Sequence, residues 1–272
     1  MSTIKRTYQR LVLPLWHFGI QQALSCIFPV LVFLTLALSK VIDIPFLYRY
    51  DFILLMCLLI QVAMVRTKLE SWQELKVVCI FHLIGLGLEL YKVHMGSWAY
   101  PEPAWTKIAD VPLYSGFMYA SVASYICQAW RRLSLKFVHW PANVITYTTA
   151  VLIYTNFFSH HFMPDMRWVL VVGLFFFFGK SYVHFTLNQQ RYRLPTILSF
   201  LLIGFFIWIA ENISTFFGAW QYPNQAKTWQ LVHLSKINSW FLLVIISIII
   251  VANIKHAQQD ATKAIRTTSA NG

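Results

Sequence analysis

The sequence predicts an all-α membrane protein with about eight transmembrane helices in two parallel four-helix repeats. Of the 272 residues, 58% are hydrophobic and 12% are charged, against roughly 45–50% and about 25% in soluble domains. The apolar residues form long runs, and one motif recurs in both halves of the chain. Because membrane β-strands would show alternating segments of ~10 residues, we expect these runs to be helices.

Eight apolar runs approach the roughly 17–25 residues that a helix needs to cross a bilayer. They are 17–39, 50–65, 75–95, 111–130, 142–158, 167–187, 194–216 and 231–254. The second run is short and the fifth contains Asn143 and Asn156, so seven spans is the alternative count. The first run follows Lys5, Arg6 and Arg10 but is too long for a cleaved signal sequence, so we expect it to stay as the first helix.

The basic residues predict the orientation of these spans. The two tails and the second, fourth and sixth connections hold fourteen Lys and Arg, whereas the other connections hold five: Lys40, Arg49, Lys107, Arg167 and Lys227. Because basic residues concentrate on the inner side, both termini should be cytoplasmic. The formal charge of +12 is scattered in small groups, which favours the lipid bilayer and not nucleic acid as a partner.

The repeated motif divides the chain into halves. Glu89 is followed by Gly96-Ser97-Trp98-Ala99-Tyr100-Pro101, and Glu211 is followed by Gly218-Ala219-Trp220-Gln221-Tyr222-Pro223, with every position offset by 122. The copies end the third and seventh spans, which predicts repeats at 1–135 and 136–272. Since each half has an even number of spans, the halves should share one orientation about an axis along the membrane normal.

On the third and seventh spans, small, polar and ionisable residues are spaced three and four apart, so each set lies on one helical face. The first stripe holds His82, Gly85, Glu89, Lys92 and Gly96, and the second holds Gly204, Trp208, Glu211, Thr215 and Gly218. Small and ionisable residues avoid lipid, so both stripes should face the bundle interior. Each Glu should lie roughly 10 Å below its turn, under a mouth lined by Trp98, Tyr100, Trp220 and Tyr222.

The two glutamates are the candidate catalytic residues. A carboxylate in a membrane costs ~2.5–3.5 kcal/mol on insertion scales, unless it is neutral or paired with a cation such as Lys92, Lys180 or Lys236. Glu89 and Glu211 are therefore read as an acid/base or cation-binding pair. The alternative is a pair of structural staples that join the halves.

Another polar cluster lies at the outer end of the fifth span. It comprises Asn156, His160, His161, Asp165 and Arg167, with His94 and His233 at the same level. Histidine and carboxylate can ligate zinc or iron, but adjacent helical residues point about 100° apart. We therefore expect a hydrogen-bonded network and no metal. Lys180 and His184 are expected one turn apart on the sixth span, facing the interior.

Several sequence signatures bear on cofactors. The four cysteines include no CxxC pair, which gives no support to a disulfide framework or a cysteine zinc site. The chain has no GxSxG, HExxH, Walker or GxGxxG motif, which argues against ATP-driven transport and nicotinamide chemistry. The sequence implies no particular cofactor.

Four long stretches are distinctive: GSWAYPEPAW, VPLYSGFMYASVASYICQAWR, YTNFFSHHFMPDMRW and WIAENISTFFGAWQYPNQAKTWQLVHLSKINSW. They resemble the YoaT-like family of uncharacterised bacterial integral membrane proteins. This resemblance covers roughly 75–255 and implies a multi-pass protein of the bacterial inner membrane.

A weaker pattern, Glu followed by Gly, an aromatic residue and Tyr, is similar to membrane-embedded carotenoid hydratases and heterodimeric lycopene cyclases. That similarity implies protonation of a lipid or isoprenoid ligand by Glu89 or Glu211, although the paired acidic run of the cyclases is absent here. Three functions therefore stay open. They are an enzyme acting on a lipidic substrate, a small transporter or channel for a cation or proton, and a structural membrane protein.

Overall fold

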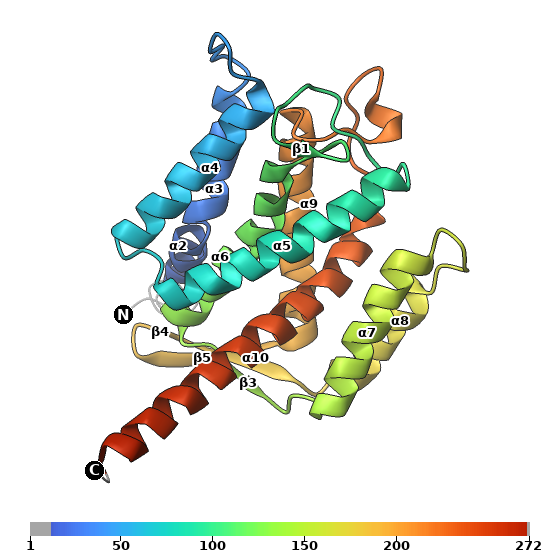
Figure 1. The fold of residues 1–272 in the computed structure, drawn as a ribbon. Coiled ribbons are helices and arrows are strands. Elements are labelled where there is room, and N and C mark those ends of the chain that lie inside the picture. The colour runs from blue at the N-terminus through green and yellow to red at the C-terminus, as the bar shows by residue number, and fades with distance from the viewer. Residues whose placement is uncertain (1–11, 271–272) are drawn as a thin grey trace, which may run out of the picture.

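The computed structural model describes residues 12–270, with side chains through Ile254, and is mostly helical (Figure 1). The longer helices are α2 (Leu13–Ser25), α3 (Ile27–Leu38), α4 (Arg49–Arg66), α5 (Trp72–His94), α6 (Gly116–Leu133), α7 (Asn143–Ser159), α8 (Arg167–Phe178), α9 (Thr196–Phe216) and α10 (Lys236–Ala270). The expected basic tail residues Lys5, Arg6 and Arg10 lie outside the described residues.

Every predicted apolar run contains a helix, but fewer helices are long and apolar enough to cross a membrane alone. Among the described residues three qualify, α5, α9 and residues Lys236–Ile254 of α10, and a fourth is counted if the bent pair α2–α3 is one span. The structure thus supports a helical protein with three or four apolar spans. Eight spans in two repeats stay a prediction.

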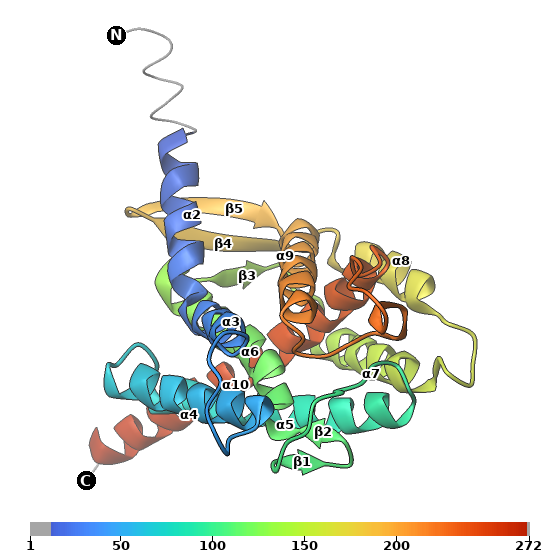
Figure 2. The same ribbon diagram turned by 90° about the horizontal axis from the view of Figure 1, so that it is seen from above.

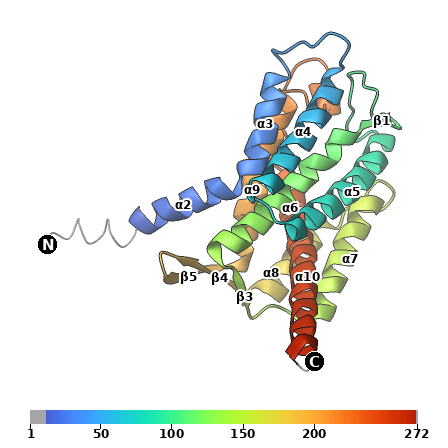
Figure 3. The ribbon, with the colours of Figure 1, turned by 60° about the vertical axis from the view of Figure 1, so that its left-hand side comes forward.

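The first run is bent, not straight. α2 and α3 meet at an angle of 61°, and α2 turns away from the bundle (Figure 3). Pro29 has no N–H for the carbonyl of Ser25, which removes one helical hydrogen bond at the bend. The 12 residues of α3 therefore extend only about 18 Å, while Leu15 and Trp16 of α2 are exposed.

The expected sixth helix over 167–187 is wrong in its second half. α8 ends at Phe178, and the chain continues as β4 (Tyr182–Leu187) paired antiparallel with β5 (Gln190–Pro195). The alternating sequence of β4 favours a strand, and Asn188 and Gln189, at φ 47° and 64°, form the two-residue turn that suits a hairpin. Lys180 is consequently exposed in a turn and His184 lies on a strand, so they do not share a helix face.

The connections between helices gather at two ends of the molecule. At the sheet end, β3 (Lys136–Val138) pairs with β4, and Arg131 donates to Glu74 (3.1 Å) and to the carbonyl of Leu69 (2.6 Å). At the mouth end, Arg49 bonds Glu102 (2.6 Å) and the carbonyl of Gly218 (3.1 Å). Short strands β1 (Lys107–Ile108) and β2 (Val111–Pro112) and the turns η2 (Leu113–Ser115) and η3 (Pro223–Gln225) also belong to the mouth end.

Two glycines allow close packing within matching helix pairs, α5 with α6 and α9 with α10. A Cβ at Gly85 would lie 2.5 Å from the ring of Tyr119, and one at Gly204 would lie 3.0 Å from the backbone of Phe241. Seen from above, α6 and the first half of α10 lie near the middle, between α3 and α4 on one side and α7 and α8 on the other (Figure 2). The two pairs thus place α5 and α9 beside the centre of the bundle.

Candidate functional site

The two repeated motifs end their helices in the same way. Gly96 and Gly218 have φ of 68° and 67°, a left-handed conformation that favours glycine. Ser97 N–H bonds the carbonyl of Lys92 and Ala219 N–H bonds that of Ser214, each at 2.9 Å. Both ends are therefore Schellman motifs, which turn the chain back toward the preceding glutamate.

Equivalent residues of the two motifs also contact each other. Ala99 and Gln221, which are offset by 122, form an antiparallel bridge. Each donates its N–H to the other's carbonyl at 2.9 Å. A reciprocal contact between equivalent positions is what a local twofold axis produces.

Both candidate glutamates line one cavity of about 130 Å³. Ten residues that the sequence analysis singled out border it: Glu89, Lys92, Trp98, Asn156, His160, Arg167, Glu211, Trp220, Tyr222 and Lys236. Drug-sized ligands occupy pockets of roughly 300–1,000 Å³, so this cavity is small. It suits a small polar molecule or ion, or several waters.

Glu89 accepts three hydrogen bonds from neutral donors. Its Oε2 accepts from Trp98 Nε1 (2.6 Å) and from Tyr100 OH (2.7 Å), and its Oε1 accepts from Tyr119 OH (2.9 Å). Tyr100 lies behind the cavity wall and is 4% exposed. Burial, followed by the charge of Glu89, raises the pKa of Tyr100 well above its usual value, so its hydroxyl stays a donor.

Glu211 accepts two hydrogen bonds. Its Oε1 accepts from Tyr222 OH, at the position equivalent to Tyr100, and its Oε2 accepts from Trp240 Nε1 at 2.8 Å. Trp220 is equivalent to Trp98 and borders the cavity, but the indole that donates to Glu211 is that of Trp240. Burial and then the charge of Glu211 raise the pKa of Tyr222 well above its usual value. The carboxylate is thus held by donors that cannot neutralise it.

The expected ion pairs of the glutamates are not formed among the described side chains. Lys92 Nζ donates to the carbonyl of Phe157 (2.8 Å) and lies 3.1 Å from His161 Nε2. Lys236 Nζ lies over the rings of Tyr222 (4.7 Å to the centroid) and Trp98 (5.6 Å). Both ammonium groups face the cavity, and no carboxylate among the side chains of residues 12–254 lies within 4.0 Å of either.

The polar cluster after α7 forms a hydrogen-bonded network. Asn156 donates to Asp165 (3.3 Å), and Arg167 Nε donates to Asp165 at 2.6 Å. Burial acts to raise the pKa of Asp165, but the bonds from Arg167 and Asn156 lower it to about 2. His160 bonds backbone carbonyls of α7, and His161 contacts Lys92. Within residues 12–254, no group of three or more His, Cys, Asp or Glu is placed to hold a metal ion.

Two donors were not found from the sequence. Tyr119 on α6 and Trp240 on α10 reach Glu89 and Glu211 from the helix that follows each motif. Trp240 is offset by 122 from Met118, the neighbour of Tyr119. Extending the repeat beyond Pro101 would have pointed to this helix pair, although the residue types differ.

These features define a helical protein with apolar helices of membrane-spanning length and a charged cavity beside a duplicated turn. The chain belongs to the family described as "Protein of unknown function (DUF817)", whose model matches residues 14–248. It is 59% identical over 249 residues to the "Uncharacterized protein YoaT" of Bacillus subtilis (strain 168), covering 91% of this chain and 94% of that protein. No solved structure matches it significantly.

The YoaT-like resemblance is confirmed by these comparisons. The similarity to carotenoid hydratases and lycopene cyclases is not shown by them.

Proposed function

We propose that this chain is a multi-pass protein of the bacterial inner membrane that binds a small cation or proton at Glu89 and Glu211 and carries it across the membrane. In this proposal eight segments form two parallel halves, 1–135 and 136–272, and both termini are cytoplasmic. The observation that carries the proposal is the single cavity that both glutamates line. A structural staple would need no such cavity.

The two-ended arrangement of the connections supports the proposed topology. The fourth and sixth connections, which are rich in Lys and Arg, meet in one sheet through β3 and β4. The third and seventh connections meet through Ala99 and Gln221 at the mouth end. The placement of these four connections, two at each end, supports alternating membrane segments.

The glutamates keep capacity to bind a cation. A carboxylate offers about four acceptor positions, and the hydrogen bonds described above use three at Glu89 and two at Glu211. Ionisable groups inside a membrane bundle mark ion and proton pathways. The glutamates therefore keep acceptor capacity at the cavity that they line, which supports binding of a cation there.

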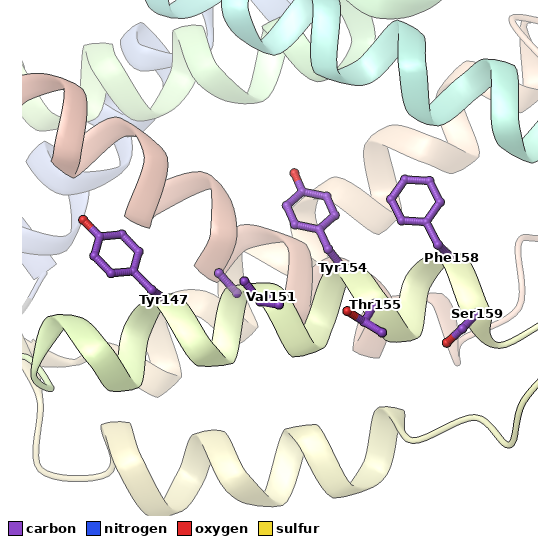
Figure 4. Close-up of a pocket in the computed structure, with 7 residues that line it drawn as sticks. Tyr147, Val151, Tyr154, Thr155, Phe158 and Ser159 are labelled. Atoms are coloured by element: carbon purple, nitrogen blue, oxygen red, sulfur yellow. The ribbon is translucent and has the colours of Figure 1, made fainter.

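A second candidate is the acid/base enzyme acting on a lipidic ligand. A shallow groove of about 600 Å³ runs along α7 and is lined by Tyr147, Ala150, Val151, Tyr154, Thr155, Phe158 and Ser159. Figure 4 shows Tyr147, Tyr154 and Phe158 rising from the same side of the helix. An acyl or isoprenoid chain could lie there, beside Phe157 of the cavity wall. The charged lining of the cavity favours the transporter.

Flux through reconstituted liposomes tests the proposal. Protein in liposomes is energised by an inside-negative potassium diffusion potential, and entry of protons, labelled sodium or labelled choline is followed in parallel. We expect one of these fluxes to exceed that of empty liposomes and to fall at least tenfold in Glu89→Gln and Glu211→Gln. Glu74→Gln is the matched control, since glutamine preserves its helix cap. Undiminished flux in both cavity variants, or no flux by the unaltered protein, would contradict the proposal.

Labelling of single cysteines tests the topology separately. A thiol introduced by Ala104→Cys or Ala226→Cys at the mouth end should react with an impermeant reagent in intact cells. One introduced by Ser134→Cys at the sheet end should react only after the cells are opened. The reverse pattern would overturn the orientation.

A further inference from the structure

Lys236 holds its ammonium group in the cavity without a hydrogen bond. Among the described residues Nζ has no acceptor, and its contacts are the faces of the Tyr222 and Trp98 rings, 4.7 Å and 5.6 Å from the centroids. Cation–π attraction acts within about 6 Å of a ring centroid. The structure therefore shows an alkylammonium bound by two aromatic faces.

The two rings form a corner, which we call the aromatic corner (Trp98 and Tyr222). Their centroids are 5.9 Å apart and their planes meet at 78°. Each ring that faces the ammonium also donates to a glutamate, Trp98 to Glu89 and Tyr222 to Glu211. The carboxylates behind the rings add negative potential to this corner, since field effects are strong in a low-dielectric interior.

We propose, resting on the function proposed above, that the ligand is a small organic ammonium ion that takes the place of the Lys236 ammonium in the aromatic corner. Recognition of quaternary ammonium by aromatic side chains is a general use of cation–π contacts. A hard metal cation would instead need about six oxygen ligands, and within residues 12–254 no group of three or more His, Cys, Asp or Glu is placed to hold a metal ion.

The other charges around the cavity require that the ligand replaces the Lys236 ammonium and is not simply added beside it. Lys92 is bound to Phe157 and His161, and Arg167 is bound to Asp165 and Ser239. When Lys92, Lys236 and both glutamates are charged, the four charges cancel, so an added cation would leave a net positive cavity. Lys236 is the first residue of α10, and its flexible stem can move the ammonium out of the corner. An anion placed between the lysines would instead face two carboxylates.

The test uses a thiol introduced at the cavity by Ser239→Cys, with Cys26, Cys57, Cys79 and Cys127 replaced by serine. The rate of reaction with a trimethylammonium methanethiosulfonate is compared with that of a sulfonate analogue. Both rates are normalised to Ala226→Cys on the exposed loop. We expect at least a tenfold preference for the cationic reagent, which should increase further in Lys236→Met. Ser97→Cys, also on the cavity wall, repeats the measurement if the first variant disturbs Arg167.

Protection identifies the ligand class. Millimolar tetramethylammonium should slow the labelling several-fold in Lys236→Met, and the protection should disappear when Trp98→Leu is added. Faster labelling by the sulfonate, protection by inorganic phosphate, or no reaction at either thiol in folded protein would overturn the inference. If phosphate protects while both Gln variants still lose flux, the proposed transport is supported and the organic ammonium ligand is contradicted. If tetramethylammonium protects but no flux is seen, the ligand is supported and the proposed transport is contradicted.

Discussion

The Glu89 and Glu211 turns share one backbone but differ in how their carboxylates are held. Glu89 has three neutral donors, two of them from its own turn, whereas Glu211 has two, and only Tyr222 comes from its own turn. Lys236 lies beside the second turn, over Tyr222. The duplicated turn therefore gives one nearly saturated carboxylate and one that is more open. We infer that Glu89 contributes more to stability and Glu211 more to ligand binding.

Removing each carboxylate should separate these roles most strongly. Glu89→Leu removes the acceptor of the buried Tyr100 and of two partly buried donors, whereas Glu211→Leu removes the acceptor of the buried Tyr222 and of one partly buried donor. Each unsatisfied buried group costs about 1–3 kcal/mol, and partly buried groups cost less. Thermal unfolding in detergent should therefore show the lower melting temperature for Glu89→Leu. Equal melting temperatures would mean that the difference in hydrogen bonding has no energetic consequence.

The glutamine variants should behave differently from the leucine variants. A tyrosine hydroxyl can accept as well as donate, so Gln at either position can keep Trp98 or Trp240 on its oxygen and donate to Tyr119 or Tyr222. We expect both variants to accumulate in the membrane and to melt within a few degrees of the unaltered protein, yet to lose flux. Poor accumulation with full flux in the folded fraction would show that the glutamates are staples.

Removing the tyrosine hydroxyl of each turn, Tyr100 or Tyr222, should give a smaller difference, which is measured in flux. Tyr222→Phe leaves Glu211 with one donor, whereas Tyr100→Phe leaves Glu89 with two. A bond to a charged group contributes about 1.5–3 kcal/mol. Tyr222→Phe should therefore reduce flux more than Tyr100→Phe does, and a larger effect at Tyr100 would reverse the assignment of roles.

Alanine substitutions at Gly96 and Gly218 should give the smallest difference in melting temperature. An alanine at Gly96 or Gly218 meets the same unfavourable positive φ, a cost of about 1 kcal/mol. At Gly96 the added Cβ meets nothing within 4 Å, but at Gly218 it would lie 3.0 Å from Lys40 Nζ and 3.7 Å from Arg49. Gly218→Ala should melt at a slightly lower temperature than Gly96→Ala. The opposite order would exclude crowding at the Lys40 and Arg49 side chains as the cause.

The duplicated turns also allow a direct check of their contact. A hydrogen-bonded antiparallel pair has its Cα atoms about 5.5 Å apart, which suits a disulfide. Ala99→Cys combined with Gln221→Cys should therefore form an intramolecular crosslink on mild oxidation, seen as a mobility shift after proteolysis. Ala104→Cys combined with Gln221→Cys is the control. Equal crosslinking of both pairs would indicate random encounter.

The sequence was most informative where its pattern repeats. The offset of 122 located both turns, and helical spacing placed Glu89, Lys92 and Glu211 on buried faces. Periodicity could not locate Tyr119 or Trp240, because their contact with the glutamates depends on how close α5 packs to α6 and α9 to α10. The strand β4 was missed because its hydrophobic residues continue the apolar run of α8. The alternation and the Asn188-Gln189 turn were the available signals.

A double-mutant cycle on cation flux tests most directly whether Glu89 and Glu211 form one functional site. Flux is measured for Glu89→Gln, Glu211→Gln and the double variant at equal protein content in liposomes. Residues that act on one ligand are coupled, and their effects do not add in free energy. We predict that the flux of the double variant is no lower than that of the single variant with the lower flux. A double variant whose flux falls by the product of the two single reductions would show two independent sites and contradict a shared cavity function.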